Sequence, residues 1–150
     1  MMISEFEMSL VGELNYFLGL QVKQENDGIF ISQTKYAKNL AKKFGLEGSK
    51  AARAPMSTCA KIHKDSSGKD VNQTLYRSMI RSLLYLTASR PDITFAIKVC
   101  ARFQNCLKES YLQAVKTIIK YVYCAIDYGL QYTHDTNTNL VGFSDADWAK

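Results

Sequence analysis

Two aspartates near the end of the chain, Asp145 and Asp147, have the spacing of a metal-binding pair. They follow the apolar run Leu140–Phe143, which predicts a buried strand, and residues i and i+2 of a strand point to the same face of a sheet. Neighbouring carboxylates suit Mg²⁺, which prefers hard oxygen ligands, and two such ions can clamp a phosphodiester during cleavage. Two solvated acids close to the end of the sequence are an equally good interpretation of the same residues.

Other catalytic signatures are absent from the sequence. It contains no G-x-S-x-G nucleophile motif, neither of the glycine-rich phosphate loops G-x-x-x-x-G-K-[ST] and G-x-G-x-x-G, and no adjacent Asp-Asp pair. The four cysteines form no C-x-x-C, and only one histidine, His63, stands near a cysteine, four residues after Cys59. Because a zinc site needs clustered ligands, reduced thiols on helix faces are the favoured interpretation.

The chain has 150 residues and a mass of 17.0 kDa, the size of one ordinary domain. Its 47% hydrophobic and 22% charged residues are typical of a globular protein and exclude a disordered chain. There is no apolar run of about 18 residues to predict a membrane span, and residues 1–8 do not resemble a secretory signal. Nineteen basic and fourteen acidic residues give a net charge of +5, spread evenly along the chain, which suits a polyanionic partner.

The first third of the chain predicts a β-hairpin and a helix. Two apolar runs, Tyr16–Val22 and Ile29–Gln33, flank a polar turn in which Asp-Gly is a hairpin signal. Residues 34–44 have helical periodicity, with Thr34 as the expected N-cap and Gly45 as the expected stop. Four lysines on this helix form either a solvated face or a contact with a phosphate backbone: Lys35, Lys38, Lys42 and Lys43.

The rest of the chain predicts a helical centre and a strand pair. Residues 47–72 are rich in Gly, Ser and Lys and predict a linker or extended crossing segment, with Pro55 fixing a turn. Apolar stripes predict helices over about 73–88, 91–105 and 109–126, packed as a bundle. Strands follow at Tyr128–Tyr132 and from Leu140. We therefore expect an α+β fold, in which a loosely attached β-hairpin precedes a helical bundle and a C-terminal strand pair.

Four ordered blocks carry a family resemblance: Phe6–Leu46, Pro55–Thr58, Leu75–Gln104 and Gly142–Ala149. Together they resemble the pol polyprotein of copia-type LTR retrotransposons, and plant copies most of all. The family implies a reverse transcriptase, which carries out RNA-directed DNA synthesis, followed by a ribonuclease H, in an element that integrates its DNA. On that layout the chain is a truncated fragment of a larger fold, beginning after the polymerase Tyr-x-Asp-Asp segment and ending just inside ribonuclease H.

The resemblance also implies a division of the chain. Residues 1–33 would be a palm remnant with a primer-grip-like hairpin, 34–46 a thumb-like helix and 47–72 a linker. Residues 73–128 would be a helical thumb or connection, and 129–150 the first strands of ribonuclease H. The sequence departs from the family pattern at Arg81, Leu107, Cys124 and Lys150, where Gly, Pro, Gly and Gly are usual. An arginine in place of a helix-contact glycine is expected to cost packing unless its head reaches water.

Functional residues follow from the resemblance as expectations. Asp145 matches the first ribonuclease H carboxylate, in a site that these residues leave incomplete; it would hold Mg²⁺ only in the complete parent enzyme, with Asp147 as a further candidate ligand. The chain itself is expected to bind no cofactor. Residues expected to contact primer–template nucleic acid are Tyr16, Phe17, Leu18, Gly19, Lys35, Lys38, Lys42, Lys43, Arg90 and Arg102.

Three functions remain open at this stage. The chain is expected to be catalytically inactive and at most to bind an RNA–DNA hybrid or duplex, as a remnant of an integrated element. It could instead be a co-opted, non-catalytic nucleic-acid-binding module, or part of an active enzyme together with the remainder of the pol polyprotein. No membrane partner is expected, and the location would be intracellular, in a cytoplasmic particle or the nucleus.

Overall fold

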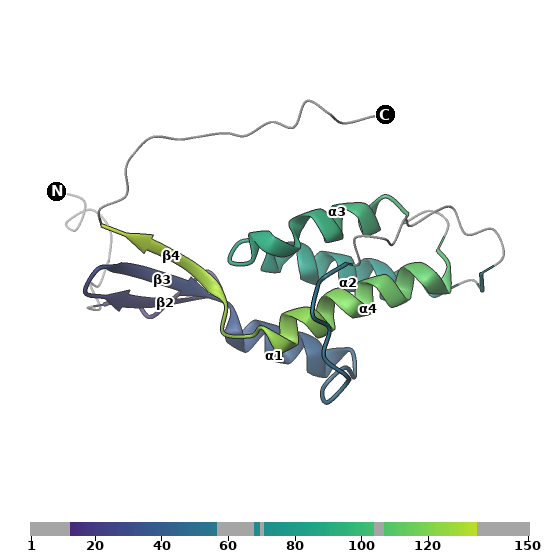
Figure 1. Ribbon diagram of the computed structural model, residues 1–150, viewed down its shortest axis with the longest axis horizontal. Helices are drawn as coiled ribbons and strands as arrows, with labels where there is room; N and C mark the ends of the chain where they lie inside the picture. Colours follow the sequence, from purple (N-terminus) through teal and green to yellow (C-terminus); the bar gives the residue numbers. More distant parts are fainter. Residues whose placement is uncertain (1–12, 57–67, 70, 104–106, 135–150) are drawn as a thin grey trace, which may run out of the picture.

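The computed structural model describes residues 13–56, 68–69, 71–103 and 107–134. Within these ranges the chain is an α+β structure with one antiparallel sheet and four α-helices (Figure 1). The sheet has the strand order β1 (Tyr16–Phe17), β2 (Leu20–Glu25), β3 (Gly28–Ser32) and β4 (Gly129–Thr133). The helices are α1 (Thr34–Lys43), α2 (Gln73–Leu86), α3 (Thr94–Ala101) and α4 (Glu109–Cys124), with a 3-10 turn, η2 (Pro91–Ile93), before α3.

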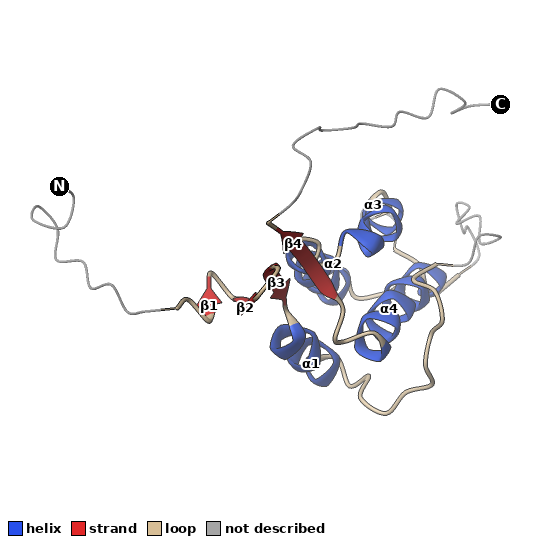
Figure 2. Cartoon of the chain, turned by 60° about the vertical axis from the view of Figure 1, so that its left-hand side comes forward, coloured by secondary structure: helices blue, strands red, loops and turns tan. Residues whose placement is uncertain are grey.

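The helices share one hydrophobic core, and the sheet extends from one end of it (Figure 2). The helices predicted over 73–88, 91–105 and 109–126 are confirmed as α2, η2 with α3, and α4. Deep in the core, the hydroxyl of Tyr76 donates to the carbonyl of Cys100 at 2.8 Å. The spacing that predicts the first of these helices uses Leu75, Tyr76, Met79, Ile80, Leu83, Leu84 and Thr87 as its apolar stripe. That stripe is wrong at two positions, since Leu75 and Leu84 are 38% and 46% exposed. Leu86 is buried instead, so the buried face of α2 is rotated slightly from the predicted one.

The ends of α1 show how the chain turns into and out of the core. Thr34 is not the N-cap: Gln33 holds that position, and the Thr34 hydroxyl donates to the Ile126 carbonyl at 3.2 Å, joining α1 to the segment after α4. Gly45 ends the helix as predicted, with φ +63°. Its N–H donates to the Lys42 carbonyl, and the next N–H donates to the Ala41 carbonyl, which satisfies the free carbonyls of the last turn.

The predicted hairpin is β2 and β3, with a turn one residue earlier than expected. Glu25 pairs with Gly28, so Asn26 and Asp27 are the central turn residues, and neither has a positive φ. The glycine therefore does not serve the turn. It lies at the first position of β3, where an added Cβ would meet the Tyr132 carbonyl oxygen of β4. Gly28 thus permits the close approach of a strand more than a hundred residues away.

The strand β4 has a different position from the one expected for the C-terminal strand. Its pairing with β3 runs from Gly28↔Thr133 to Ser32↔Gly129, so the described part of 129–150 completes the hairpin sheet instead of starting a separate one. A second glycine fits this contact, because a Cβ on Gly129 would meet the Ile31 carbonyl oxygen. The expectation of a loosely attached hairpin is therefore wrong. The later residues of the predicted ribonuclease H segment, Asp145 and Asp147 included, lie outside the described residues.

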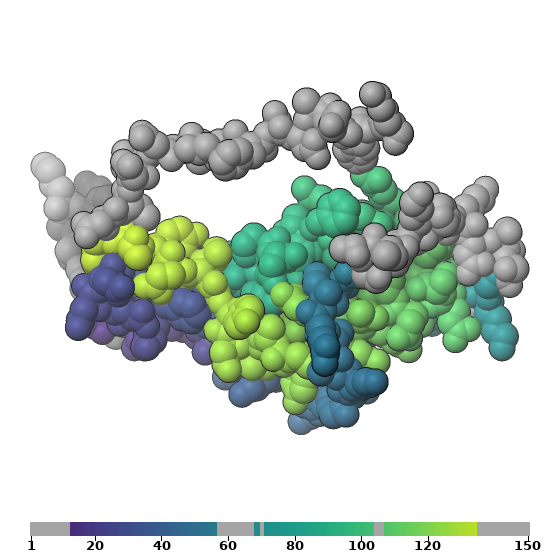
Figure 3. Space-filling model, in the orientation of Figure 1, coloured from purple at the N-terminus to yellow at the C-terminus, as the bar shows by residue number. Residues whose placement is uncertain are grey.

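Residues 47–56, the first described part of the predicted linker, form neither helix nor strand. It crosses over α4 (Figure 1; Figure 3), and Met56 packs against the core. Further along, the Lys69 carbonyl accepts a hydrogen bond from the Glu109 N–H at 3.0 Å, at the start of α4. These contacts fit the extended crossing that the sequence predicts for this segment.

Candidate nucleic-acid interface

The connection between β1 and β2 forms an exposed apolar tip. Tyr16, Phe17 and Leu18 are 51%, 52% and 77% exposed, respectively. Leu18 has φ +48° and Gly19 has φ +81°, and so this tight turn uses a left-handed backbone at both positions. We call Tyr16–Gly19 the hairpin tip; its aromatic and aliphatic side chains are available to pack against a base or sugar.

Tyr85 of α2 fixes the hairpin tip to the helices. Its hydroxyl donates to the Leu18 carbonyl at 2.7 Å, and a Cβ on Gly19 would meet that same hydroxyl. The Tyr85 ring meets the ring of Tyr36 edge-on, with 4.7 Å between centroids, and the Tyr36 hydroxyl donates to the Ser82 carbonyl. A chain of two tyrosines therefore sets the position of the tip relative to α1 and α2.

The four lysines of α1 all lie on the exposed surface of this helix. Lys35, Lys38, Lys42 and Lys43 are all exposed, whereas Ala37, Leu40 and Ala41 on the other side of α1 are buried in the core. The Lys35 N–H donates to the Gln21 side chain at 2.8 Å, which joins the start of α1 to β2. Among the described residues, none of the four ammonium groups has an ion-pair partner. We call these four residues the lysine face.

Positive charge is concentrated on two helices, although it is even along the sequence. Helices α1 and α2 together carry four Lys and two Arg and no Asp or Glu, while the whole chain has a net charge of +5. The rest of the chain therefore has a net charge of −1. A surface of one sign attracts a polyanion at a distance, and this effect falls with ionic strength.

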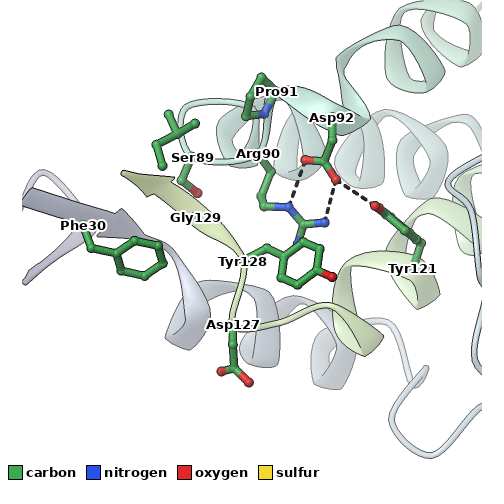
Figure 4. A pocket seen from close by; sticks show the side chains of 10 residues that line it. Phe30, Ser89, Arg90, Pro91, Asp92, Tyr121, Asp127, Tyr128 and Gly129 are labelled. Atoms are coloured by element: carbon green, nitrogen blue, oxygen red, sulfur yellow. Dashed lines mark hydrogen bonds and ion pairs between the residues drawn. The ribbon is translucent and has the colours of Figure 1, made fainter. Parts of the chain in front are cut away.

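Arg90, expected to contact nucleic acid, is instead part of the interior. It is 3% exposed, and its guanidinium donates to both carboxylate oxygens of Asp92 at 2.8 and 2.9 Å (Figure 4). A third bond, at 2.7 Å, reaches the Ala125 carbonyl just after α4. Because its donors are used inside the fold, Arg90 is not part of the candidate interface.

Arg90 lies at the centre of a polar junction between helices and sheet. It lies 5.4 Å from the ring centroids of both Tyr121 and Tyr128, and the Tyr121 hydroxyl donates to Asp92. Burial alone would lower the pKa of Arg90 and raise that of Asp92; their mutual hydrogen bonds and charges instead hold the pKa of Arg90 above, and the pKa of Asp92 below, the ordinary value. Arg90, Asp92 and the two tyrosines line an open hollow of about 510 Å³, and Phe30 of β3 lines it from the side of the sheet. The junction therefore orients the sheet against the helical core.

Two further predicted site residues lie away from the tip. Arg102 is exposed, but it follows α3, which runs from η2 away from the sheet (Figure 1), so it is not part of the lysine face. Asp145 and Asp147 cannot be placed, because they are outside the described residues. In the parts of the chain that are described, no group of three His, Cys, Asp or Glu side chains is arranged to hold a metal ion. No helix within them is long and apolar enough to span a membrane.

Three interface residues were not found from the sequence. Tyr85 gives no local signal, because its partner Leu18 is 67 residues away. Arg77 and Arg81 of α2 lie on the side of that helix opposite its buried stripe, together with Ser78 and Ser82. Arg81 is exposed, and its charged head therefore reaches water without the packing cost expected where the family usually has glycine.

Comparison with known proteins agrees with the resemblance. A reverse transcriptase (RNA-dependent DNA polymerase) family model matches residues 1–58. Over 137 residues the chain is 34% and 30% identical to the retrovirus-related Pol polyproteins from transposons RE1 and RE2 of Arabidopsis thaliana, covering 91% of this chain and 9% of each polyprotein. It is 35% identical over 150 residues to an uncharacterized mitochondrial protein of the same plant, covering 97% of this chain and 60% of that protein.

The chain thus spans less than two thirds of these relatives, and only a small part of the two polyproteins. No solved structure matches it. The family model matches the first part of the chain, and the plant relatives match nearly all of it. The chain belongs with the plant copia-type retrotransposon Pol polyproteins, and its match to a reverse transcriptase covers residues 1–58.

Proposed function

We propose that this chain binds primer–template nucleic acid, an RNA–DNA hybrid or a duplex, through the hairpin tip and the lysine face. One observation carries the proposal: an exposed apolar tip is held by Tyr85 next to an acid-free helix with four lysines that lack ion-pair partners among the described residues. Lysines of this kind neutralise phosphates without reading bases. The binding is therefore expected to have little sequence preference.

The two parts of the interface have different roles in this proposal. The lysine face follows the sugar–phosphate backbone, and each neutralised phosphate releases counterions. The rings of Tyr16 and Phe17 pack against a base or sugar at the end of the primer strand, a contact that any base can make. Because Tyr85 and Tyr36 position the tip relative to α1, the end of the strand and its backbone would be held at a fixed separation.

Catalysis is assigned to the remainder of the parent polyprotein. Phosphoryl transfer by a polymerase depends on carboxylate-held metal ions, and the sequence has no adjacent Asp-Asp pair. We therefore propose that the chain alone neither extends a primer nor cuts RNA, and that Mg²⁺ chemistry, including any role of Asp145 and Asp147, needs the complete enzyme. The same interface would serve a non-catalytic binding module.

Fluorescence anisotropy with a labelled, 3′-recessed RNA–DNA duplex tests the proposal. The wild-type chain is compared with a variant in which the four lysines of the lysine face are replaced by glutamine. A matched control makes the same charge change elsewhere, by replacing Lys50, Lys69, Lys98 and Lys120 with glutamine. All three proteins are first compared by circular dichroism and thermal unfolding, so that a loss of fold is not mistaken for a loss of binding.

The proposal predicts that the lysine-face variant loses affinity by roughly a hundredfold, because about four phosphate contacts are removed. The control should lose no more than a few-fold, through the general decrease in positive charge. Equal losses in the two variants would show that net charge alone, and not this face, attracts the duplex. A wild-type chain that binds no duplex at low salt would refute the proposal altogether.

A further inference from the structure

The sheet ends on an uncharged edge strand, β4 (Figure 1). In the described part of the chain β4 pairs with β3 alone, so its other side has no strand beside it. The segment from Tyr128 to Thr133 contains neither a charged residue nor a proline, and Tyr128 and Tyr132 are 63% and 53% exposed. Charges and prolines are among the means by which proteins keep a further strand away from such an edge, and β4 carries none of them.

The opposite edge of the same sheet is better protected. There β1 covers Leu20 and Gln21 of β2. The rest of β2 carries Lys23 and Glu25, which form an exposed ion pair at 2.8 Å. A further strand on that side would have to lie alongside these charges. Of the two edges of the sheet, β4 is therefore the one suited to accept another strand.

The ladder between β3 and β4 shows which main-chain groups of β4 point outward. The His134 N–H donates to the Asp27 carbonyl at 2.9 Å, in line with the register of the two strands. Hydrogen-bonded residues alternate along an antiparallel pair, so every second residue before His134 bonds toward β3. Gly129 and Gln131 therefore direct their N–H and C=O groups to the open side, where no described residue bonds to them.

The sequence of this edge is complementary to itself. Tyr128, Leu130 and Tyr132 alternate along the chain and so share one face. When two copies lie antiparallel with Leu130 opposite Leu130 of the partner subunit, each Tyr128 lies opposite Tyr132 of the partner subunit. In the same register, Gly129 and Gln131 of the two copies form two hydrogen-bonded pairs, with two main-chain bonds in each pair. The symmetric pattern thus matches apolar side chains and outward hydrogen-bonding groups at once.

We propose that two copies of this chain associate through β4, antiparallel and about a two-fold axis at Leu130. Such a contact uses the same surface on both copies and is closed by symmetry. Main-chain bonds hold the strands together, and the cross-strand pairs of tyrosine and leucine add to the stability. Because β1 is at the far edge of each sheet, both hairpin tips stay at the outer ends of the joined sheet. The inference does not depend on nucleic-acid binding.

Sedimentation velocity of the full chain, across a micromolar to submillimolar concentration series, tests this association. The first variant is Gln131→Pro, which removes an outward N–H and takes no bond from the ladder with β3; proline is tolerated at such edge positions. The matched control is Gln24→Pro on β2, where the same alternation directs the N–H away from β3. Circular dichroism and thermal unfolding first establish that all three proteins are folded.

Wild type should form dimers that dissociate on dilution. Gln131→Pro should weaken dimerisation by roughly tenfold or more, because one of the two bonds in each hydrogen-bonded pair is lost. Gln24→Pro should dimerise as wild type does. A wild-type chain that stays monomeric, or a Gln131→Pro variant that dimerises as well as wild type, would overturn the inference. Slow amide exchange at Gln131 in a monomeric chain would show that a segment of the same chain occupies the edge instead.

Disulfide cross-linking tests the register. A cysteine at position 130 would meet its own copy across a non-hydrogen-bonded pair, at a Cα separation of about 4.5 Å, which a disulfide can span. Leu130→Cys should therefore give a covalent dimer under a mild oxidant. Tyr132→Cys, which would lie opposite Tyr128 of the partner subunit, should not. The opposite result would overturn the two-fold axis at Leu130. Both variants are made in a chain with serine at three native cysteines, Cys59, Cys106 and Cys124.

Discussion

Arg90 is the residue whose replacement best tests how the sheet is held to the helices. Substitution by methionine keeps a long apolar side chain but removes the guanidinium. Three hydrogen bonds are lost with it, two to the Asp92 carboxylate and one to the Ala125 carbonyl. The Arg90 side chain is almost fully buried, so the groups that lose its hydrogen bonds are the half-exposed Asp92 carboxylate and the Ala125 carbonyl.

The expected loss of stability depends on how deeply Arg90 and Asp92 are each buried. Breaking a fully buried ion pair by removing one partner costs about 3–5 kcal/mol, because a charge is left buried and unpaired. Here the Asp92 side chain is 37% exposed, and water can solvate much of its charge once the arginine is gone. The unpaired Ala125 carbonyl adds about 1 kcal/mol. We therefore expect a loss of roughly 2–4 kcal/mol, which in a chain of this size lowers Tm by roughly 5–15 °C.

Thermal and urea unfolding, followed by circular dichroism, measure this loss. Arg53→Met is the matched control, because Arg53 is exposed in the crossing segment and the same atoms are removed. The control should stay within about 0.5 kcal/mol of wild type. If Arg90→Met is no less stable than Arg53→Met, the junction does not hold the sheet to the core, and the account given of it is refuted.

Three other predictions concern single groups. Arg90 lowers the pKa of Asp92 in the folded chain. The ionised Asp92 should therefore stabilise the fold fully above the unfolded pKa of about 3.9, and this stabilisation should be lost as the pH falls below that value. Asp92→Asn should remove that part of the acid sensitivity in urea titrations, and an unchanged pH profile would contradict this. Gly129→Ala would press a Cβ against the Ile31 carbonyl and should cost about 1–3 kcal/mol, with faster amide exchange in β4 than in a Gln131→Ala control; equal exchange would contradict it. Burial raises the pKa of the Cys100 thiol to about 11. A thiol reagent at neutral pH should therefore label exposed Cys124 well before Cys100, as measured by peptide mass spectrometry. Equal labelling rates would mean that the core opens readily.

The local elements could be predicted because their signals are local. Periodic apolar residues give the three central helices, and the position of Gly45 gives the end of α1. The errors come from tertiary context: the Asp-Gly pair looked like a turn, but Gly28 serves the approach of β4. Nothing in the sequence near residue 28 indicates a partner at Tyr132.

In the candidate interface too, residues with a local sequence signal could be predicted, and residues that depend on distant contacts could not. Exposure of the lysines could be predicted from the helical periodicity of α1, because the opposite positions are apolar. The burial of Arg90 could not, although an acid two residues later was a signal for an internal ion pair. Tyr85 and the arginines of α2 were missed because their significance depends on a turn that lies far away in the sequence.

The central claim is that the hairpin tip and the lysine face bind a primer–template duplex. It is tested most directly by the affinity of the full chain for a 3′-recessed RNA–DNA duplex, measured across a series of salt concentrations. We predict that log affinity falls linearly with log salt with a slope of about −3.6 or steeper, and that replacing the lysine face by glutamine makes the slope shallower by about 3.6. A slope near zero, or the same slope in both proteins, would contradict it.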